Sequence, residues 1–396
     1  MACRRSRKRP ESPGARSKGA AIWGIPVEIF TGAARPILDR WFESEELKGT
    51  LATDAVIGAF AAPSMPGTAY VLFHHVMGET NGARGVWSYV RGGMGGLTQA
   101  LAAAARDLGV EIRVDAEVAR ILTKGNRATG VVLANGDEYA AKQITSNADC
   151  HVTFERLLDP KALPPDFRDA VARIDYSSAS MKINLALERL PAFTALRGGA
   201  NVACHPERSA EGAQSEDRPG PEHRGTIHFC PDQDFIERAY DDAKYGVPSR
   251  EPVVELTIPS AVDETLAPLG KYVASMFVQY APYVLKSGMW TQALRDEVAD
   301  RCFAIVERYA PGFTSSVLHR QVLAPPDIEK TFNLTGGNIF QGAMSLNQLF
   351  VARPIPGYAN YRTPVRGLYL CGSAAHPGGG VMGAAGKNAA QVMLRG

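Results

Sequence analysis

Residues 367–386 decide the fold, with the sequence Gly367-Leu-Tyr-Leu-Cys-Gly372-Ser-Ala-Ala-His376-Pro-Gly378-Gly-Gly-Val-Met-Gly383-Ala-Ala-Gly386. The short apolar run bounded by glycines predicts a buried strand. The glycines after it allow the backbone to turn sharply and to approach a ligand closely. The alanine-rich segment that follows predicts a helix whose first N–H groups point back toward the loop. A glycine loop between a strand and a helix N-terminus is suited to binding an anion.

A second glycine cluster, Gly92-Gly93-Met94-Gly95-Gly96, lies between a strand-like run and a predicted helix. Residues 110–114 alternate between apolar and polar side chains, which predicts a strand. Two further runs, 128–133 and 138–144, flank Asn135-Gly136, a dipeptide typical of hairpin turns. The order of glycine loop, helix, strand and meander predicts an α/β fold with an antiparallel addition.

The composition is that of a soluble globular protein. A chain of 396 residues is long enough for two or three domains, and 45% of its residues are hydrophobic. The net charge of +2 gives no sign of a nucleic-acid partner. No apolar run reaches the roughly 18 residues of a membrane span. The basic N-terminus lacks the apolar stretch of a secretory signal, so we expect a cytoplasmic protein, with the mitochondrial matrix as the alternative.

The cysteines and histidines give no pattern of a metal site. The six cysteines contain no CxxC pair, which disfavours zinc and a disulfide framework and favours a reducing compartment. We expect Cys371 to be a buried thiol. His74 and His75 are adjacent and cannot share one helical face, so we expect no metal there. His376 either polarises a ligand or bonds to backbone, and His228 is either structural or substrate-lining.

Several motifs resemble those of the flavin-dependent phytoene desaturase-like oxidoreductases, and of one branch of that family in particular. The resemblance covers most of the chain from about Ala34 onward. It implies a partial FAD-binding domain of the Rossmann-like, phytoene desaturase or amine oxidase type, together with an α+β substrate domain. The motifs are Tyr89-Val-Arg-Gly-Gly-Met94, Ile144-Thr-Ser-Asn-Ala-Asp149, Gly225-Thr-Ile-His-Phe229, Gly337-Asn-Ile-Phe-Gln-Gly342, Leu368-Tyr-Leu-Cys-Gly-Ser373 and His376-Pro-Gly-Gly-Gly380.

The resemblance, together with the composition of residues 1–32 and 201–221, implies a domain division, and the resemblance also implies a set of cofactor contacts. The expected activity is a two-electron oxidation of an apolar or amine-bearing small molecule, with no catalytic residue assigned. The division is a disordered basic tail over 1–32, helices of the substrate domain over 33–84, FAD-binding parts over 85–150 and 331–396, and the substrate domain over 151–330 with a disordered insertion at 201–221. The FAD contacts are Gly92, Gly93, Met94, Gly95, Val118, Gly372, Ser373, Gly379, Gly380, Val381 and Met382.

The chain departs from this family's pattern at its start. The family opens with a βαβ unit that carries GxGxxG and an acidic ribose ligand, and we find no such unit before Ala34. The chain therefore resembles an N-terminally truncated member. The alternative function is a non-catalytic remnant that acts by protein association, including with copies of itself, through apolar surface left exposed.

Overall fold

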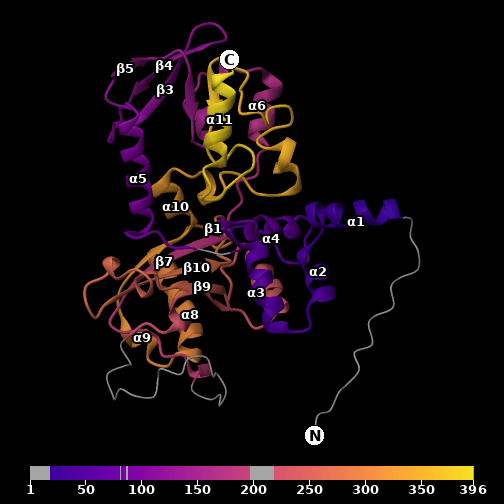
Figure 1. Ribbon diagram of the computed structural model, residues 1–396, viewed down its shortest axis with the longest axis vertical. Helices are drawn as coiled ribbons and strands as arrows, with labels where there is room; N and C mark the ends of the chain where they lie inside the picture. The colour runs from indigo at the N-terminus through magenta and orange to yellow at the C-terminus, as the bar shows by residue number, and fades with distance from the viewer. Residues whose placement is uncertain (1–17, 81, 86–87, 197–217, 396) are drawn as a thin grey trace.

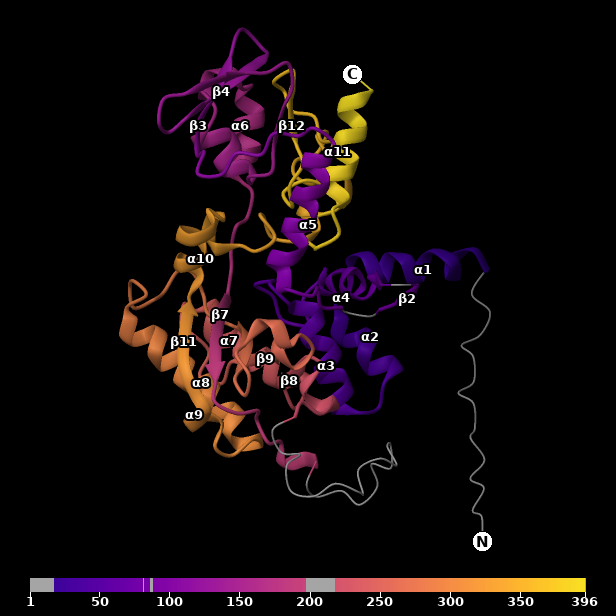
Figure 2. The same cartoon turned by 60° about the vertical axis from the view of Figure 1, so that its left-hand side comes forward.

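The computed structural model describes residues 18–80, 82–85, 88–196 and 218–395. Two parts stand one above the other in Figure 1, and the N-terminal helices lie beside the lower part. Figure 2 shows the same arrangement from another side. The helices are α1 (Lys18–Thr31), α2 (Ala34–Trp41), α3 (Glu45–Val56), α4 (Thr68–Val76), α5 (Gly93–Asp107), α6 (Pro165–Ala172), α7 (Gln233–Lys244), α8 (Gln292–Tyr309), α9 (Phe313–Ser316), α10 (Pro325–Phe332) and α11 (Ala384–Leu394).

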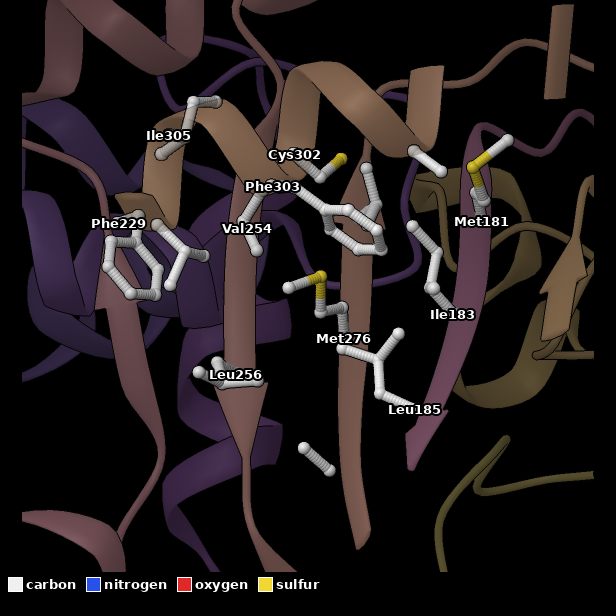
Figure 3. Packing of buried hydrophobic residues seen from close by; sticks show 14 of the residues in the cluster. Met181, Ile183, Leu185, Phe229, Val254, Leu256, Met276, Cys302, Phe303 and Ile305 are labelled. Atoms are coloured by element: carbon white, nitrogen blue, oxygen red, sulfur yellow. The ribbon is translucent and has the colours of Figure 1, made fainter. Parts of the chain in front are cut away.

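The lower part is built on an antiparallel sheet with the strand order β11-β7-β10-β9-β8. Alternate residues of a strand point to opposite faces, so each strand presents one set of side chains to each side. On one face, apolar side chains pack under α8 to form the largest core, as Figure 3 shows for Met276, Leu256 and Phe303. The strands are β7 (Ser180–Leu187), β8 (Ile227–Phe229), β9 (Val253–Thr257), β10 (Tyr272–Gln279) and β11 (Val317–Leu323).

The upper part combines a short parallel sheet with an antiparallel meander. Strand β12 (Leu368–Leu370) pairs in parallel with β6 (Ile144–Ser146). Beside them β3 (Val118–Thr123), β4 (Ala128–Leu133) and β5 (Glu138–Ala140) form the predicted hairpin and its extension. A second core, which includes Phe154, Phe167 and Leu370, holds α6 and α11 against these strands. A small hairpin of β1 (Glu79–Thr80) and β2 (Ala83–Arg84) follows α4.

The prediction of a disordered tail over residues 1–32 is wrong for its described part, because helix α1 begins at Lys18. The helix is held by aromatic packing, since the ring of Phe30 lies 5.3 Å from that of Phe350 and 6.0 Å from that of Tyr70. The insertion predicted over 201–221 is largely outside the described residues. Where it becomes describable it is ordered, with Gly220 buried and a short 3-10 helix over Pro221–His223.

The strand predicted over residues 110–114 is also wrong. These residues are irregular and exposed, and within the described chain no neighbouring strand pairs with them. An extended segment needs a partner for its backbone groups before it becomes a strand. The preceding Ser88–Val90 forms no strand either, so the first glycine loop follows irregular chain. By contrast, the predicted strand in β12 and the predicted helices in α5 and α11 are confirmed.

None of the helices in the described residues is long and apolar enough to cross a bilayer.

Candidate functional site

The loop between β12 and α11 packs tightly against the rest of the upper part. A Cβ atom at Gly372 would clash with the carbonyl of Asn147, so the two loops that follow β12 and β6 touch through their backbones. A Cβ atom at Gly379 would lie 2.7 Å from a ring carbon of Phe340. These positions need glycine for close approach.

The outer end of this loop is open. Gly380, Val381, Met382 and Gly383 are exposed, and a Cβ atom at Gly383 would meet no other atom within 4 Å. Gly383 has φ of +65° and is the N-cap of α11. The free N–H groups of the first turn of α11 therefore begin at an open glycine loop, as the sequence predicts.

Arg353 anchors the inner end of the loop. It is fully buried, and its guanidinium donates to the carbonyl of Ser373 through Nε at 3.0 Å and Nη2 at 2.7 Å. The same group donates to the carbonyls of Phe340, Gly342 and Gln348. No carboxylate of the described residues forms an ion pair with it. Burial lowers the pKa of Arg353 to about 10.

Two histidine side chains approach this loop and leave ring nitrogens unpaired. His74 Nε2 lies 2.8 Å from the carbonyl oxygen of Gly379, which ties α4 to the loop. His376 lies in the loop itself, where burial lowers the pKa of its imidazole and Arg353 adds to the effect. The Nδ1 atoms of both rings are buried and have no hydrogen-bond partner among the described residues. Such atoms are suited to a polar ligand.

The first glycine loop contacts the lower part. The N–H of Gly92, at the N-terminus of α5, donates to Asp263 Oδ2 at 2.6 Å. Hydrogen bonds from Thr265 and from this N–H lower the pKa of Asp263. The positive end of the α5 dipole therefore already has a carboxylate of the same chain beside it. A phosphate group at this N–H would have to displace Asp263.

A groove of about 1300 Å³ opens beside this loop. Tyr89, Arg91, Asp263 and Lys271 are among its lining residues, so both charge signs are present. Burial raises the pKa of Tyr89. The groove joins the first glycine loop to the sheet of the lower part.

The predicted FAD contacts thus lie in three places. Gly372, Ser373, Gly379, Gly380, Val381 and Met382 share the loop before α11. Gly92, Gly93, Met94 and Gly95 form the N-terminal end of α5, where Met94 is exposed. Val118 begins β3 in the antiparallel meander. Cys371, expected to be buried, is half-buried, and Cys150, Cys230, Cys302 and Cys371 are free thiols.

A polar row crosses the face of the lower sheet that points away from its core. Phe277 on β10 pairs in register with Lys182 on β7 and with Glu255 on β9, and Glu255 pairs with His228 on β8. Because paired residues share a face, the four side chains form one row. Lys182, Phe277 and His228 are half-buried, whereas Glu255 is 9% exposed.

Helices α3 and α4 bring further polar groups to this row. Thr53 Oγ1 lies 2.7 Å from His228 Nδ1, and this nitrogen lies 3.7 Å from Glu255 Oε1. On the same helix as Thr53, Asp54 has a carboxylate oxygen 3.7 Å from His75 Nδ1. His74 and His75 therefore point to different neighbours, the loop and α3, as their adjacency in a helix predicts.

Several side chains in this row and beside it have pKa values that differ from their ordinary values. Burial raises the pKa of Glu255 to about 8, and the charge of Asp54 acts in the same direction, while Lys182 opposes it. Burial raises the pKa of Asp54 to about 6. Burial lowers the pKa of His75 to about 4 and also lowers that of His228. Groups with pKa values displaced in this way are typical of functional sites.

Sequence reasoning did not find Asp54, Glu255, Lys182 or Arg353, and it left His228 between two roles. The signal for Glu255 and Lys182 was present, since each is the charged residue of a largely apolar strand. Their meeting depends on strand register and could not be read from local sequence. Within the described part of the chain, no group of three or more His, Cys, Asp or Glu side chains is arranged to hold a metal ion.

The sequence of this chain is similar to those of flavin-dependent oxidoreductases. A family model described as flavin containing amine oxidoreductase matches residues 11–219. Pyridine nucleotide-disulfide oxidoreductase domain-containing protein 2 of Rattus norvegicus is 47% identical over 371 residues, covering 93% of this chain and 61% of that protein. The zeta-carotene-forming phytoene desaturase of Myxococcus xanthus is 26% identical over 87% of this chain and 58% of its own length. The chain thus spans about three fifths of these relatives.

Solved structures share the fold. An oxidoreductase from Methanosarcina mazei matches with a TM-score of 0.56 and 18% identity, covering 95% of this chain and 71% of that one. Putrescine oxidase, in a structure with putrescine bound, matches with a TM-score of 0.52 and 14% identity over 94% of this chain and 70% of its own. The mixed α/β fold expected from the sequence is confirmed.

Replacing Arg353 by methionine is expected to lower the free energy of unfolding by about 3 kcal/mol or more. The reason is that several buried carbonyls lose their donor, at about 1–3 kcal/mol for each group left unpaired. Urea denaturation followed by circular dichroism measures the change. Arg366→Met, at an exposed arginine, is the matched control and should change stability little. Equal stability of the Arg353 variant and wild type would contradict the anchoring role.

The raised pKa of Glu255 predicts a loss of stability as pH rises. In the folded state the Glu255 carboxyl holds its proton up to about pH 8, whereas in the unfolded chain it releases the proton near pH 4.5. The contribution of this carboxyl to the free energy of unfolding is therefore full below about pH 4.5 and is lost by about pH 8. The lowered pKa values of His75 and His228 affect stability below about pH 6.5, where they make stability rise with pH.

Glu255→Gln should therefore lose less stability than wild type between about pH 6.5 and pH 8, as measured by urea denaturation at both values. Glu251→Gln, at an exposed glutamate two residues before β9, should retain the wild-type dependence. An unchanged pH slope in Glu255→Gln would show that this carboxyl is not held neutral by the fold.

Proposed function

This chain belongs to the flavin containing amine oxidoreductase family, and from that premise we propose that it binds FAD and takes part in the two-electron oxidation of a small molecule. The substrate is an apolar or amine-bearing compound. When bound, the flavin accepts the electrons, and the protein supplies binding, orientation and electrostatics. We place the protein in the cytoplasm, with the mitochondrial matrix as the alternative.

The loop before α11 is the single observation that carries this proposal. Its tip is exposed, its glycines allow close approach, and the free N–H groups of α11 begin at Gly383. The unpaired Nδ1 atoms of His74 and His376 are further donors or acceptors beside it. Gly379, Gly380, Val381 and Met382 would hold the flavin here.

The first glycine loop supports a different role from the one that the resemblance implies. Its Gly92 N–H is already bonded to Asp263, so this helix end fits an acidic side chain of the chain itself. We propose that Gly92 to Gly95 border the site, next to the groove at Tyr89 and Arg91, and that Val118 contributes backbone at its far end.

A substitution at the loop tip tests the proposal. Val381 is 79% exposed, so Val381→Asp should leave the fold intact while it places a negative charge beside the phosphate-bearing cofactor. We expect the Kd for FAD to rise about tenfold or more, a loss of about 1.4 kcal/mol in binding. Quenching of flavin fluorescence on titration measures the Kd.

The control is Val284→Asp, which places the same charge on a valine that is 76% exposed in the lower part. It should bind FAD like wild type. A colourless wild-type protein that takes up no FAD on reconstitution would contradict the proposal for this chain. If Val381→Asp and Val284→Asp weaken FAD binding equally, the loop is not part of the FAD site.

A second candidate function, protein association, is supported by one observation. Helix α5 buries none of its side chains. Together with residues 110–114 it exposes a run of apolar groups, which we call the α5 apolar surface. Exposed apolar patches are typical of interaction surfaces. The residues of this surface are Leu101, Leu108, Val110, Ile112 and Val114.

Self-association through the α5 apolar surface should disappear when it is charged. We expect wild type to sediment above the monomer mass of 42.5 kDa and the double variant Val110→Lys, Val114→Lys to shift toward that mass. Sedimentation velocity over a concentration series measures this. Leu269→Lys, at a fully exposed leucine elsewhere, should sediment like wild type. A monomeric wild type at every concentration would contradict association between copies.

A further inference from the structure

We propose that the lower sheet binds the carboxylate of an apolar acid, with Lys182 as the cation and the hydroxyls of Ser180 and Ser275 as hydrogen-bond donors. The site lies on the face that carries the polar row, which we call the open face. The inference rests on the proposed function, because it names the polar end of an apolar substrate. An ammonium and hydroxyl groups suit a carboxylate, since each donates a hydrogen bond and the ammonium supplies the opposite charge.

Lys182 is a half-buried cation without a partner of its own. Its neighbours in register are Phe277 on β10 and Leu323 on β11, and both are apolar. Within the described part of the chain, its ammonium forms no ion pair and no hydrogen bond. Burial lowers the pKa of Lys182, and the charge of Glu255 acts in the opposite direction. An anion bound beside this ammonium would stabilise its charged form.

Glu255 does not supply that anion at neutral pH. It lies on the other side of Phe277 from Lys182 in the polar row. Burial raises the pKa of Glu255 to about 8, so this carboxyl keeps its proton at pH 7. Asp54, on α3, acts on Glu255 at the far end of the row from Lys182. The Lys182 end therefore has an ammonium and no ionised carboxylate beside it, which favours an anionic ligand.

Two buried hydroxyls next to Lys182 independently indicate a ligand. Ser180 precedes Lys182 by two residues on β7, so both side chains point to the open face. Ser275 on β10 pairs in register with Asn184, which follows Lys182 by two residues. The Oγ atoms of Ser180 and Ser275 are buried and have no hydrogen-bond partner among the described residues. A buried hydroxyl without a partner is costly unless a ligand or water satisfies it.

Apolar side chains continue the open face around these polar groups. Val273 pairs in register with Ala186, and Phe277 pairs with Lys182. All four are half-buried, whereas the residues of β7 and β10 that face the core under α8 are buried. The open face therefore offers apolar surface for the body of an acid and polar groups for its carboxylate.

The Ser180 end of the open face lies toward the loop before α11. Ser180 pairs in register with Gln279, whose Oε1 accepts a hydrogen bond from the N–H of Gly58 at 2.7 Å. A Cβ atom at Gly58 would lie 3.0 Å from a ring carbon of Phe340, and the same ring lies against Gly379. The carboxylate would thus be held on the side of the sheet that leads to the proposed cofactor loop.

The class of ligand can be measured without turnover. Phenylacetate is titrated into the full chain, as purified, by isothermal titration calorimetry at about pH 7. Its neutral analogue 2-phenylethanol and its cationic analogue 2-phenylethylamine are titrated in the same way. We expect phenylacetate to bind about tenfold or more tightly than either analogue. The proposal is overturned if phenylacetate does not bind, or if either analogue binds as tightly.

Substitution of the cation tests its role. Lys182→Met should raise the Kd for phenylacetate about tenfold or more. The variant should fold, because methionine replaces an unpaired ammonium with an apolar side chain of similar length. Lys286→Met, at an exposed lysine of the lower part, should bind phenylacetate like wild type. Wild-type affinity in Lys182→Met would contradict the proposal.

The serines separate a ligand-binding role from a structural one. Ser180→Ala and Ser275→Ala should each raise the Kd for phenylacetate about threefold or more, because each removes one donor. Their melting temperatures should not fall, since neither hydroxyl bonds to the described part of the protein. Ser287→Ala, at an exposed serine, is the control. Unchanged binding in both variants would show that these hydroxyls do not meet the ligand and would overturn the proposed site.

The result is separable from the test of FAD binding. Phenylacetate binding without FAD uptake would uphold the acid site and reject the flavin proposal for this chain. FAD uptake without phenylacetate binding would do the reverse.

Discussion

The buried guanidinium of Arg353 is the contact on which the candidate cofactor loop depends. It joins the carbonyl of Ser373, just after β12, to those of Phe340, Gly342 and Gln348. A cation buried among carbonyl oxygens is stabilised by hydrogen bonds instead of by an opposite charge. The chain from Gly378 to Gly383 is therefore held at its inner end and open at its tip.

The lower sheet has two faces with different roles. Alternation along each strand buries side chains such as Met276 and Leu256 under α8, and the same alternation directs Glu255 and Phe277 to the other side. The core face supplies stability, and its rigidity fixes the spacing of the polar row. A site built on paired strands is positioned more precisely than one built on loops alone.

Sequence reasoning predicted those elements whose pattern is local. The hairpin at Asn135-Gly136 and the strand, loop and helix at the C-terminus each carry their own signal. It failed at residues 110–114, because alternation predicts a strand only where a neighbour pairs with it. It also missed helix α1, because the packing of Phe30 on Tyr70 is a tertiary contact.

The polar row could not be predicted for a related reason, since it joins residues far apart in the sequence. The pairing of Glu255 with His228 and Phe277 is set by register, and the approach of Asp54 is set by helix packing. The glycine loops, in contrast, were found from composition alone.

Helix α4 gives the two sites a common support. Its consecutive histidines have different neighbours, with His74 on the carbonyl of Gly379 and His75 beside Asp54. Helix α4 therefore contacts both the loop before α11 and Asp54. A ligand that shifted α4 through the loop would also change the surroundings of Asp54. Thermodynamic linkage is reciprocal, so protonation of Asp54 would then change the affinity for that ligand by the same free energy.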